Sequence, residues 1–471
     1  MTAFELPPIV LRIRAAAPAG ARLYLVGGVV RDMLLRRRIR DLDFVLAGDG
    51  RPIARAVANR LGGAYYPLDE TRGVGRVVLV EDGSRLTLDF AQQRGADLAA
   101  DLAARDFTLN AMAVDLADPE TIIDPLGGQS DLRAKVVRAC GPMALVDDPV
   151  RAIRAVRFAA HLGYRLDPAT RQSARDAGQH LGQVAAERRR DEFVRCLAGP
   201  RAAAAVRALA ALDLLAHLAP PAARLPGEAW DHTLATIQRL EDVLSVLHPI
   251  HDVDAASDLT LGLVSVRLGR HRAALAGHLD TVISDERPAR WLVAFAALFH
   301  DLPVAPAERQ ATARQVAQDL RLSQEEGRRA AAILAGAAAF EALVVVEASD
   351  SPLTRRALFR YFQEAGTAGI EGVLLASASY LAQFTGPAPT EAWNQRLDAA
   401  SALMRAYFET PEEAVRPIPL VTGDDVMNEF GVPAGPRLGR LLRALYEAQA
   451  AGEVTDRAAA MAFLRRALDQ G

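Results

Sequence analysis

The stretch that decides the N-terminal fold is Leu23-Tyr-Leu-Val-Gly-Gly-Val-Val-Arg-Asp-Met-Leu-Leu-Arg-Arg-Arg-Ile-Arg-Asp-Leu-Asp-Phe-Val-Leu46. Its apolar start predicts a buried strand. The following Gly27-Gly28 permits a sharp turn and a close approach to a ligand. A short helix over 29–36 and a second strand over 41–46 follow. Residues two apart on a strand share one face, so Asp41 and Asp43 are predicted to point the same way.

Asp41 and Asp43 form a candidate metal site. Two like charges on one face repel, which is unfavourable unless a cation lies between them. A hard divalent ion, held by carboxylates and by the phosphates of a substrate, suits this chemistry. Paired carboxylates behind a glycine turn therefore favour metal-assisted phosphoryl or nucleotidyl transfer. An Asp-x-Asp alone is also typical of a solvated strand end, so the prediction depends on the ordered combination.

The composition predicts a globular chain of several domains. Its 471 residues are too many for one compact core, and 51% are hydrophobic and 24% charged. The net charge of -3 argues against a globally basic nucleic-acid binder but allows local patches such as 188–190. The two cysteines, Cys140 and Cys196, lack zinc-ligand spacing and fit a reducing cytoplasm. No apolar run is long enough for a bilayer, so no membrane association is expected.

Strand signals are concentrated in the first part of the chain. They lie at 23–26, 41–46, 76–80, 85–90 and 111–114. Asp82-Gly83 is a hairpin-turn signal between the third and fourth of these strands. From Pro149 onward helical periodicity dominates. The predicted fold class is therefore α+β, with a small mixed sheet in an N-terminal part and an all-helical remainder.

Four motifs, in order, resemble one known family. Gly27-Gly-x-x-Arg31-Asp32 followed by Asp41-x-Asp43 resembles the head-domain signature of the class II tRNA nucleotidyltransferase and poly(A) polymerase family. The other three are Arg105-Asp-Phe-Thr-Leu-Asn-Ala-Met-Ala113, Ile123-Asp-Pro-Leu-Gly-Gly128 and Asp147-Asp-Pro-Val-Arg-Ala-Ile-Arg-Ala-Val-Arg-Phe158. The resemblance implies a nucleotidyltransferase head over 1–138, a base-recognising helical neck over 139–215, a helical body over 216–345 and a tRNA-binding helical tail over 346–471.

The resemblance also implies a role for each motif. The catalytic carboxylates would be Asp41, Asp43 and Asp89, with Mg²⁺ held by the first two and the attacking hydroxyl oriented by the third. The nucleotide-binding residues would be Gly27, Gly28 and Arg31 at the triphosphate, Arg105, Asp106 and Asn110 at the sugar, and Asp148, Arg151, Arg154 and Arg157 around the base. From the residues alone, two alternatives stay open: a salt bridge of Arg31 with Asp32 or Asp43, and a helix N-cap at Asp106.

The residues assigned to the base, Asp148, Arg151, Arg154 and Arg157, recur every third residue. This spacing predicts that they form one stripe on a helix. Three arginines on one stripe repel unless anions face them, although exposed arginine stripes are common. By resemblance, Asp148 and Arg151 copy a Watson–Crick edge and select C and A over G and U.

His232 and His300-Asp301 resemble the core of HD-type phosphohydrolases, which some family members append. No histidine follows His300, so the later metal ligands are missing and we expect a helical scaffold without metal. The C-terminal motif from Gly431 to Leu442 resembles the part of the family that holds the tRNA elbow through phosphate contacts.

The sequence thus predicts a cytoplasmic enzyme that adds C, A or both to the tRNA 3' end from CTP and ATP, with no obligate protein partner. A poly(A) polymerase, a silent RNA-binding protein and a phosphohydrolase are the alternatives. In the family a mobile loop before the motif at Arg105 helps to switch the pocket from C to A. Here that loop shrinks to a few residues around Arg94-Gly95, which raises CC-only addition as an explicit alternative.

Overall fold

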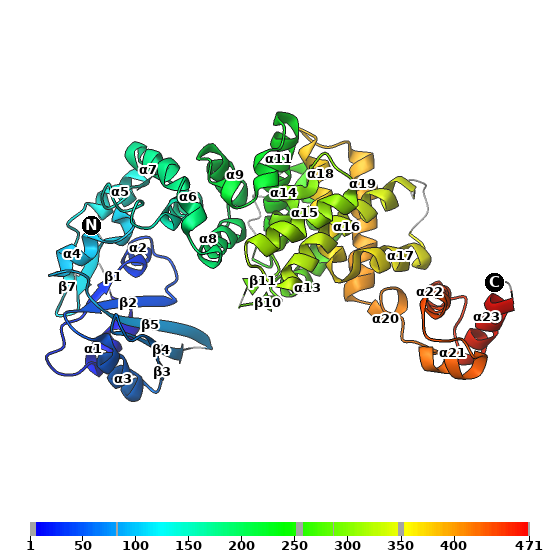
Figure 1. Ribbon diagram of the computed structural model, residues 1–471, viewed down its shortest axis with the longest axis horizontal. Helices are drawn as coiled ribbons and strands as arrows, with labels where there is room; N and C mark the ends of the chain where they lie inside the picture. The colour runs from blue at the N-terminus through cyan, green and yellow to red at the C-terminus, as the bar shows by residue number, and fades with distance from the viewer. Residues whose placement is uncertain (1–5, 82, 251–257, 286, 347–352, 470–471) are drawn as a thin grey trace. The chain divides into compact units, whose positions relative to one another are not determined.

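The computed structural model describes residues 6–81, 83–250, 258–285, 287–346 and 353–469. The chain divides into two compact units, one of residues 1–185 with 211–214 and one of residues 186–210 with 215–471. Strands and helices form the first unit, and helices make up nearly all of the second (Figure 1). The predicted α+β class is confirmed, whereas the division into head, neck, body and tail stays a prediction.

A seven-stranded mixed sheet is the framework of the first unit, in the order β3-β4-β5-β2-β1-β6-β7. Its strands are β1 (Tyr24–Val26), β2 (Asp41–Leu46), β3 (Ala64–Asp69), β4 (Val74–Glu81), β5 (Ser84–Gln92), β6 (Ala113–Asp115) and β7 (Asp118–Ile123). β2 and β5 pair in parallel, and the other neighbours are antiparallel. Five of these strands were predicted. The two that were missed, β3 and β7, are edge strands that contain Pro67 and Pro119, and proline weakens a strand signal.

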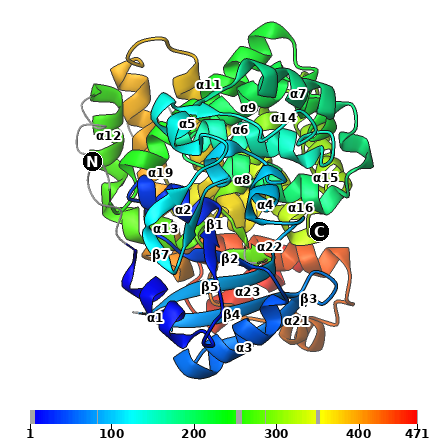
Figure 2. The same ribbon diagram turned by 90° about the vertical axis from the view of Figure 1, so that its left-hand side faces the viewer.

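The two faces of this sheet are covered differently. Helix α3 (Gly50–Leu61) packs on one face of β3, β4 and β5 (Figures 1 and 2). There Phe44 and Phe90 stack with ring centroids 4.9 Å apart. On the other face, α4 (Leu98–Ala103) supplies Leu102 to a small cluster with Val26 and Val45. Burial alternates along β4, so its residues face the α3 layer and solvent in turn.

The remaining elements of the first unit connect the sheet to a helical end. They are α1 (Pro8–Ala16), α2 (Gly28–Leu34), α5 (Gly128–Ala134), β8 (Val136–Val137), α6 (Val150–Leu162), β9 (Arg165–Leu166) and α7 (Pro168–Gly178). The predicted helix over 29–36 corresponds to α2. The hairpin between β4 and β5 was also predicted, although Asp82 of its turn lies outside the described residues.

The second unit is built around apolar helices. Its elements are α8 (Ala186–Ala198), α9 (Ala202–Ala211), α10 (Pro220–Ala223), α11 (Gly227–Val246), α12 (Leu259–Leu268), α13 (Arg272–Leu279), β10 (Val282–Ser284), β11 (Arg287–Pro288), α14 (Trp291–His300), α15 (Pro306–Asp319), α16 (Gln324–Val346), α17 (Arg355–Ala365), α18 (Gly369–Ala382), α19 (Thr390–Phe408), α20 (Pro411–Ala414), α21 (Gly423–Phe430), α22 (Pro436–Ala450) and α23 (Arg457–Asp469). Helix α14 buries nine consecutive residues, 291–299.

Two features of the second unit follow directly from its sequence. Helices α16 and α18 approach closely at two glycines, since a Cβ on Gly372 would lie 2.6 Å from the carbonyl carbon of Gly336. Helices α21 to α23 form a separate cluster around Val421 and Leu445. Just before α23, Asp456 accepts a hydrogen bond from the Ala459 N–H at 2.8 Å. Across the described ranges, no helix has both the length and the apolarity that crossing a membrane requires.

Candidate active site

The three predicted carboxylates lie on two adjacent parallel strands. Asp43 of β2 is paired with Asp89 of β5, and Asp41 lies two residues before Asp43 on the same strand. Paired residues of neighbouring strands point to the same face, as do residues two apart. The structure therefore brings Asp41, Asp43 and Asp89 together on one face of the sheet, at the end of β2 next to the Gly27 turn.

Crowding of negative charge changes the acidity of this group. Partial burial, together with the carboxylates of Asp89 and Asp41, raises the pKa of Asp43 to about 6. Asp43 is nevertheless accessible to solvent along β2. Burial is the largest cause of this shift, and repulsion by the neighbouring carboxylates is the part that a bound cation would reverse.

Asp89 has a partner that the sequence did not reveal. Arg76 of β4 donates from Nε to Oδ1 and from Nη2 to Oδ2 of Asp89, both at 2.8 Å. Such a two-point contact fixes the plane of the carboxylate as well as its charge. Only the strand pairing, which sets Arg76 beside Asp89, makes this contact foreseeable.

Gly27 lies between the carboxylates and the guanidinium of Arg105. Its φ is +85°, and a Cβ there would lie 3.0 Å from Nη1 of Arg105 and 3.6 Å from Oδ2 of Asp43. Any other residue would be strained and would fill this space. Arg105 is held by buried Asp101, to which its Nη2 donates at 2.9 Å. The side chain of Arg105 is thus fixed beside the carboxylates.

Arg31 is buried and already has partners. Its Nε and Nη2 donate to the carboxylate of Asp32, both at 2.9 Å, and its Nη1 donates to Oδ1 of Asn110 at 2.6 Å. The salt bridge with Asp32 was one of the open alternatives. In this structure Arg31 therefore orients Asn110, and its role at a triphosphate stays a prediction.

Asp106 and Asn110 are linked directly to the arginine stripe. The Asn110 Nδ2 donates to Oδ1 of Asp106 at 3.1 Å, and Oδ2 of Asp106 lies 3.1 Å from Nε of Arg154. The segment between them is a short 3-10 helix, Thr108–Asn110, rather than an α-helix. Asp106 also accepts from the Phe107 N–H at 2.8 Å. The N-cap residue of the 3-10 helix is Phe107, and no side chain caps it, so Asp106 is not the helix N-cap.

An aromatic ring contacts two arginines of the stripe together with Arg31. The guanidinium carbons of Arg31, Arg154 and Arg157 lie 5.1, 5.9 and 4.3 Å from the ring centre of Phe158. The ring face offers partial negative charge to cations. Phe158 is the last residue of the motif over 147–158, and its contact with three arginines was not predicted from the sequence.

Arg151 is fixed by backbone carbonyls. Its Nη1 donates to the carbonyl of Ala144 at 3.0 Å, and its Nη2 donates to that of Ala104 at 3.3 Å. Its Nη1 also lies 3.4 Å from the Arg105 carbonyl, and its Nε lies 3.8 Å from Asp148. Arg105 therefore connects the two halves of the site, with its side chain beside Asp43 and its carbonyl on Arg151.

The carboxylates suit a metal that is shared with a substrate. Within the described ranges no group of three or more His, Cys, Asp or Glu side chains is arranged to hold a metal ion. Asp41 and Asp43 alone supply at most four oxygens. Mg²⁺ is commonly bound by one or two carboxylates together with substrate phosphates, so the donor set fits a metal completed by a nucleotide.

Known proteins share both the domains and the whole length of this chain. Residues 23–138 match the family model described as Poly A polymerase head domain, and residues 163–225 match Probable RNA and SrmB- binding site of polymerase A. A CC-adding tRNA nucleotidyltransferase of Geobacter sulfurreducens is 32% identical over 98% of this chain and 95% of its own. The chain belongs to the tRNA nucleotidyltransferase and poly(A) polymerase family.

Further relatives agree with this assignment. An A-adding tRNA nucleotidyltransferase of Deinococcus radiodurans is 33% identical over 95% of this chain and 96% of its own. A solved CCA-adding enzyme in complex with ATP shares the fold with a TM-score of 0.67, covering 98% of this chain and 96% of that one at 18% identity. The predicted family and the predicted enzyme class, a nucleotidyltransferase of tRNA 3'-end addition, are confirmed.

The HD-like residues of this family member are hydrogen-bonded to neighbouring groups of the protein. His232 Nδ1 lies 2.9 Å from Oδ2 of Asp301, which also accepts from the Thr233 hydroxyl at 2.8 Å. His300 Nε2 lies 2.9 Å from the Ser379 hydroxyl. The Asp301 hydrogen bond raises the pKa of His232, whereas burial lowers that of His300. These contacts are typical of a structural core, and the absence of a metal stays a prediction.

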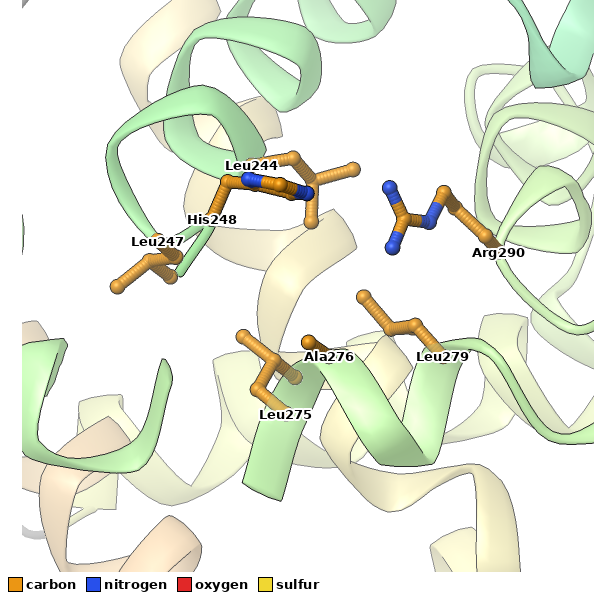
Figure 3. A pocket seen from close by; sticks show the side chains of 7 residues that line it. All are labelled: Leu244, Leu247, His248, Leu275, Ala276, Leu279 and Arg290. Carbon is orange, nitrogen blue, oxygen red and sulfur yellow. The ribbon is translucent and has the colours of Figure 1, made fainter. Parts of the chain in front are cut away.

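A small recess in the second unit is unsuited to nucleotide chemistry. Four leucines and Ala276 line it, and the side chains of His248 and Arg290 lie on opposite sides of it (Figure 3). Its lining has no carboxylate, and Arg290 is paired with Asp280 at 2.9 Å. It does not add to the site in the first unit.

Proposed function

We propose that this nucleotidyltransferase extends the tRNA 3' end with cytidine and stops at CC. The observation that carries the proposal is the connection between β5, which ends at Gln92, and α4, which begins at Leu98. The Gln93 N–H donates to the Leu46 carbonyl at 2.8 Å, and the Arg94 N–H donates to Asp101 at 2.9 Å. This connection is short, and hydrogen bonds hold its first residues. It therefore has little reach with which to change a pocket that accepts cytosine into one that accepts adenine.

The relatives support partial addition. Four relatives that align with 93–98% of this chain are CC-adding or A-adding enzymes. The CCA-adding enzymes of two Geobacillus species match 42% and 45% of it. Addition of A alone is the second candidate, because the Deinococcus radiodurans relative has that name.

The reaction is an in-line displacement at phosphorus. The 3'-hydroxyl oxygen of the tRNA bonds to the α-phosphorus of CTP, the bond to the bridging oxygen of the β-phosphate breaks, and pyrophosphate leaves. The hydroxyl proton passes to Asp89 or to water. Asp41 and Asp43 would hold Mg²⁺, and a bound Mg²⁺ would make the hydroxyl more acidic and offset charge on the triphosphate. Asp89, clamped by Arg76, orients the hydroxyl.

The neighbouring residues position the nucleotide. The backbone at Gly27 and Gly28 faces the phosphates, because glycine leaves space where the chain turns. The guanidinium of Arg105 lies next to this space and faces the phosphates as well. Asn110, oriented by Arg31 and Asp106, meets the ribose. The role of Asn110 follows the family motif. The role of Arg105 departs from it, because Arg105 lies beside Gly27 and Asp43, whereas Arg31, which the motif assigns to the triphosphate, is held by Asp32 and Asn110.

Base selection rests on one acceptor and one donor. Asp148 accepts from the exocyclic amine of cytosine, and Arg151 donates to its ring nitrogen and carbonyl. Three carbonyls hold the Arg151 guanidinium in place, and it would exchange part of these contacts for those to cytosine. U and G present the opposite pattern at one or both positions and leave buried polar groups unpaired.

The rest of the chain would hold the tRNA. Arg437, Arg440 and Arg443 are exposed along α22, where they can meet phosphate without reading sequence. Neither Cys140 nor Cys196 is in a disulfide, which agrees with a cytoplasmic site of action.

The test is product length. tRNA ending at the discriminator base, at C or at CC is incubated with CTP, ATP or both, and products are resolved at single-nucleotide resolution. Products that stop at CC are expected. Efficient addition of the final A to a CC end would show that the short connection is sufficient for CCA addition, and A addition restricted to CC ends would favour the second candidate. Long homopolymers of A would favour a poly(A) polymerase, and no incorporation at all would refute the proposal.

A further inference from the structure

One row of side chains crosses the sheet from the carboxylates to an edge. Asp43 is paired with Asp89, Asp89 with Arg76, and Arg76 with Tyr66 of the edge strand β3. Paired residues point to the same face, so all four belong to the face of the site. At about 4.8 Å per strand, Tyr66 is about 10 Å beyond Asp89.

This part of the face is open to solvent. Helix α3 packs on the opposite face of the same three strands. Tyr66 is 51% exposed, and Val78 and Thr87 are half-buried beside it. On the other side of Asp43, by contrast, α4 covers β1 and β2 through Leu98 and Leu102. An exposed aromatic beside an arginine is a recurrent arrangement for single-stranded nucleic acid.

The geometry of the reaction indicates which ligand lies on the open part of the face around Tyr66. The triphosphate elements, Gly27, Gly28 and Arg105, all follow β1 or lie against it, on one side of Asp43. In an in-line displacement the attacking and leaving oxygens are on opposite sides of phosphorus. The attacking hydroxyl must then approach from the other side, where β5, β4 and β3 follow in order.

Arg76 is suited to a double role at this place. Its Nε and Nη2 hold Asp89, so its Nη1 is not needed for that contact. Its side chain is 36% exposed, against 24% for Asp89. A guanidinium can therefore hold the carboxylate on one edge and meet a phosphate on the other.

We propose that Tyr66 and Arg76 receive the 3'-terminal nucleotides of the tRNA. Tyr66 stacks on a base near the end, and Arg76 acts as a positioning residue that holds Asp89 toward the attacking hydroxyl and contacts the adjacent phosphate. This inference rests on the proposed function, since it assumes an RNA 3' end as the acceptor.

The test separates acceptor binding from nucleotide binding. For Tyr66→Ala we expect the KM for tRNA to rise about tenfold, the loss typical of one base–aromatic stack, with the KM for CTP unchanged. Tyr66→Phe keeps the ring and should behave as wild type. Arg76→Lys keeps the charge but loses the fork, so kcat should fall about tenfold with the KM for CTP unchanged. Val80→Ala, which alters a 78% exposed side chain elsewhere on β4, is the matched control and should change neither constant.

A second measurement does not depend on catalysis. A tRNA with 2-aminopurine as its last base should lose fluorescence on binding the wild type and Tyr66→Phe, and retain it with Tyr66→Ala. If wild type transfers CMP but Tyr66→Ala matches it in both assays, the inference is wrong and the proposed function stands. If wild type transfers nothing, the proposed function fails, and retained quenching differences would still support this surface as an RNA site.

Discussion

Replacing Asp43 with asparagine should make the first unit more stable while it removes activity. The folded protein raises the pKa of Asp43 to about 6, so the charged form is disfavoured relative to the unfolded chain. A shift of this size corresponds to about 3 kcal/mol if fully expressed. Because Asp43 is accessible to solvent, screening reduces this, and we expect Asp43→Asn to raise the free energy of unfolding by about 1 kcal/mol.

The gain in the free energy of unfolding depends on pH. A carboxyl whose pKa is higher in the folded state contributes stability below its unfolded pKa, and that contribution is lost as pH rises through about 6. Asparagine cannot ionise, so the gain should be full well above pH 6 and should disappear in acid. Transfer should fall by about a thousandfold, since the carboxylate supplies several kcal/mol of charge stabilisation through the metal.

Calorimetry is the suitable assay. All three tryptophans, at 230, 291 and 393, belong to the second unit, so tryptophan fluorescence would not report on the first. A gain of about 1 kcal/mol corresponds to about 2–4 °C in Tm for a unit of this size. Asp89→Asn, which loses the charge and one of the two acceptors that hold Arg76, is the comparison variant and should have a lower Tm than Asp43→Asn. A lower Tm for Asp43→Asn above pH 6, or an equal gain at all pH values, would refute the account in which burial and the neighbouring carboxylates disfavour the charged form of Asp43.

Four further outcomes are expected. Asp148→Ala should lose discrimination against UTP more than it loses affinity for triphosphate, measured as kcat/KM ratios; a uniform loss for all four nucleotides would indicate a structural role. His300→Ala should lower Tm and leave transfer unchanged, and hydrolysis of a phosphodiester that vanishes in this variant would contradict the structural role of the HD-like residues. Burial raises the pKa of Glu241 to about 7, so Glu241→Gln should raise Tm well above pH 7 and leave it unchanged below pH 4.5; a gain only in acid would contradict this. Burial also raises the pKa of the Cys140 thiol to about 12, so its alkylation at neutral pH, followed by mass spectrometry, should be far slower than that of free cysteine.

Local pattern was sufficient for the central strands and the carboxylate face. The strand over 41–46 has the bounds of β2, because an apolar run that carries Asp41 and Asp43 two apart leaves one assignment of faces. The helical remainder was also predicted from periodicity. The edge strands were not, because Pro67 and Pro119 resemble loop residues when the neighbouring strand is unknown.

Contacts between distant segments were beyond the sequence. Arg76 became a partner of Asp89 only through strand register, and Phe158 became the platform of three arginines only through packing. Arg31 had two open alternatives, a ligand phosphate or a salt bridge. The structure pairs Arg31 with Asp32 and Asn110, because the donors of a buried guanidinium must be satisfied.

The two prolines that hid the edge strands have a consequence for how the protein behaves among other chains. An unpaired strand edge is a template on which another polypeptide can add a strand. Pro67 and Pro119 each remove one backbone donor, and the strand register shifts next to both edges. Both borders of the sheet therefore discourage aggregation. Next to one of these borders the face around Tyr66 stays open, so the protein can offer an aromatic surface to a nucleotide without offering an edge to a neighbouring polypeptide.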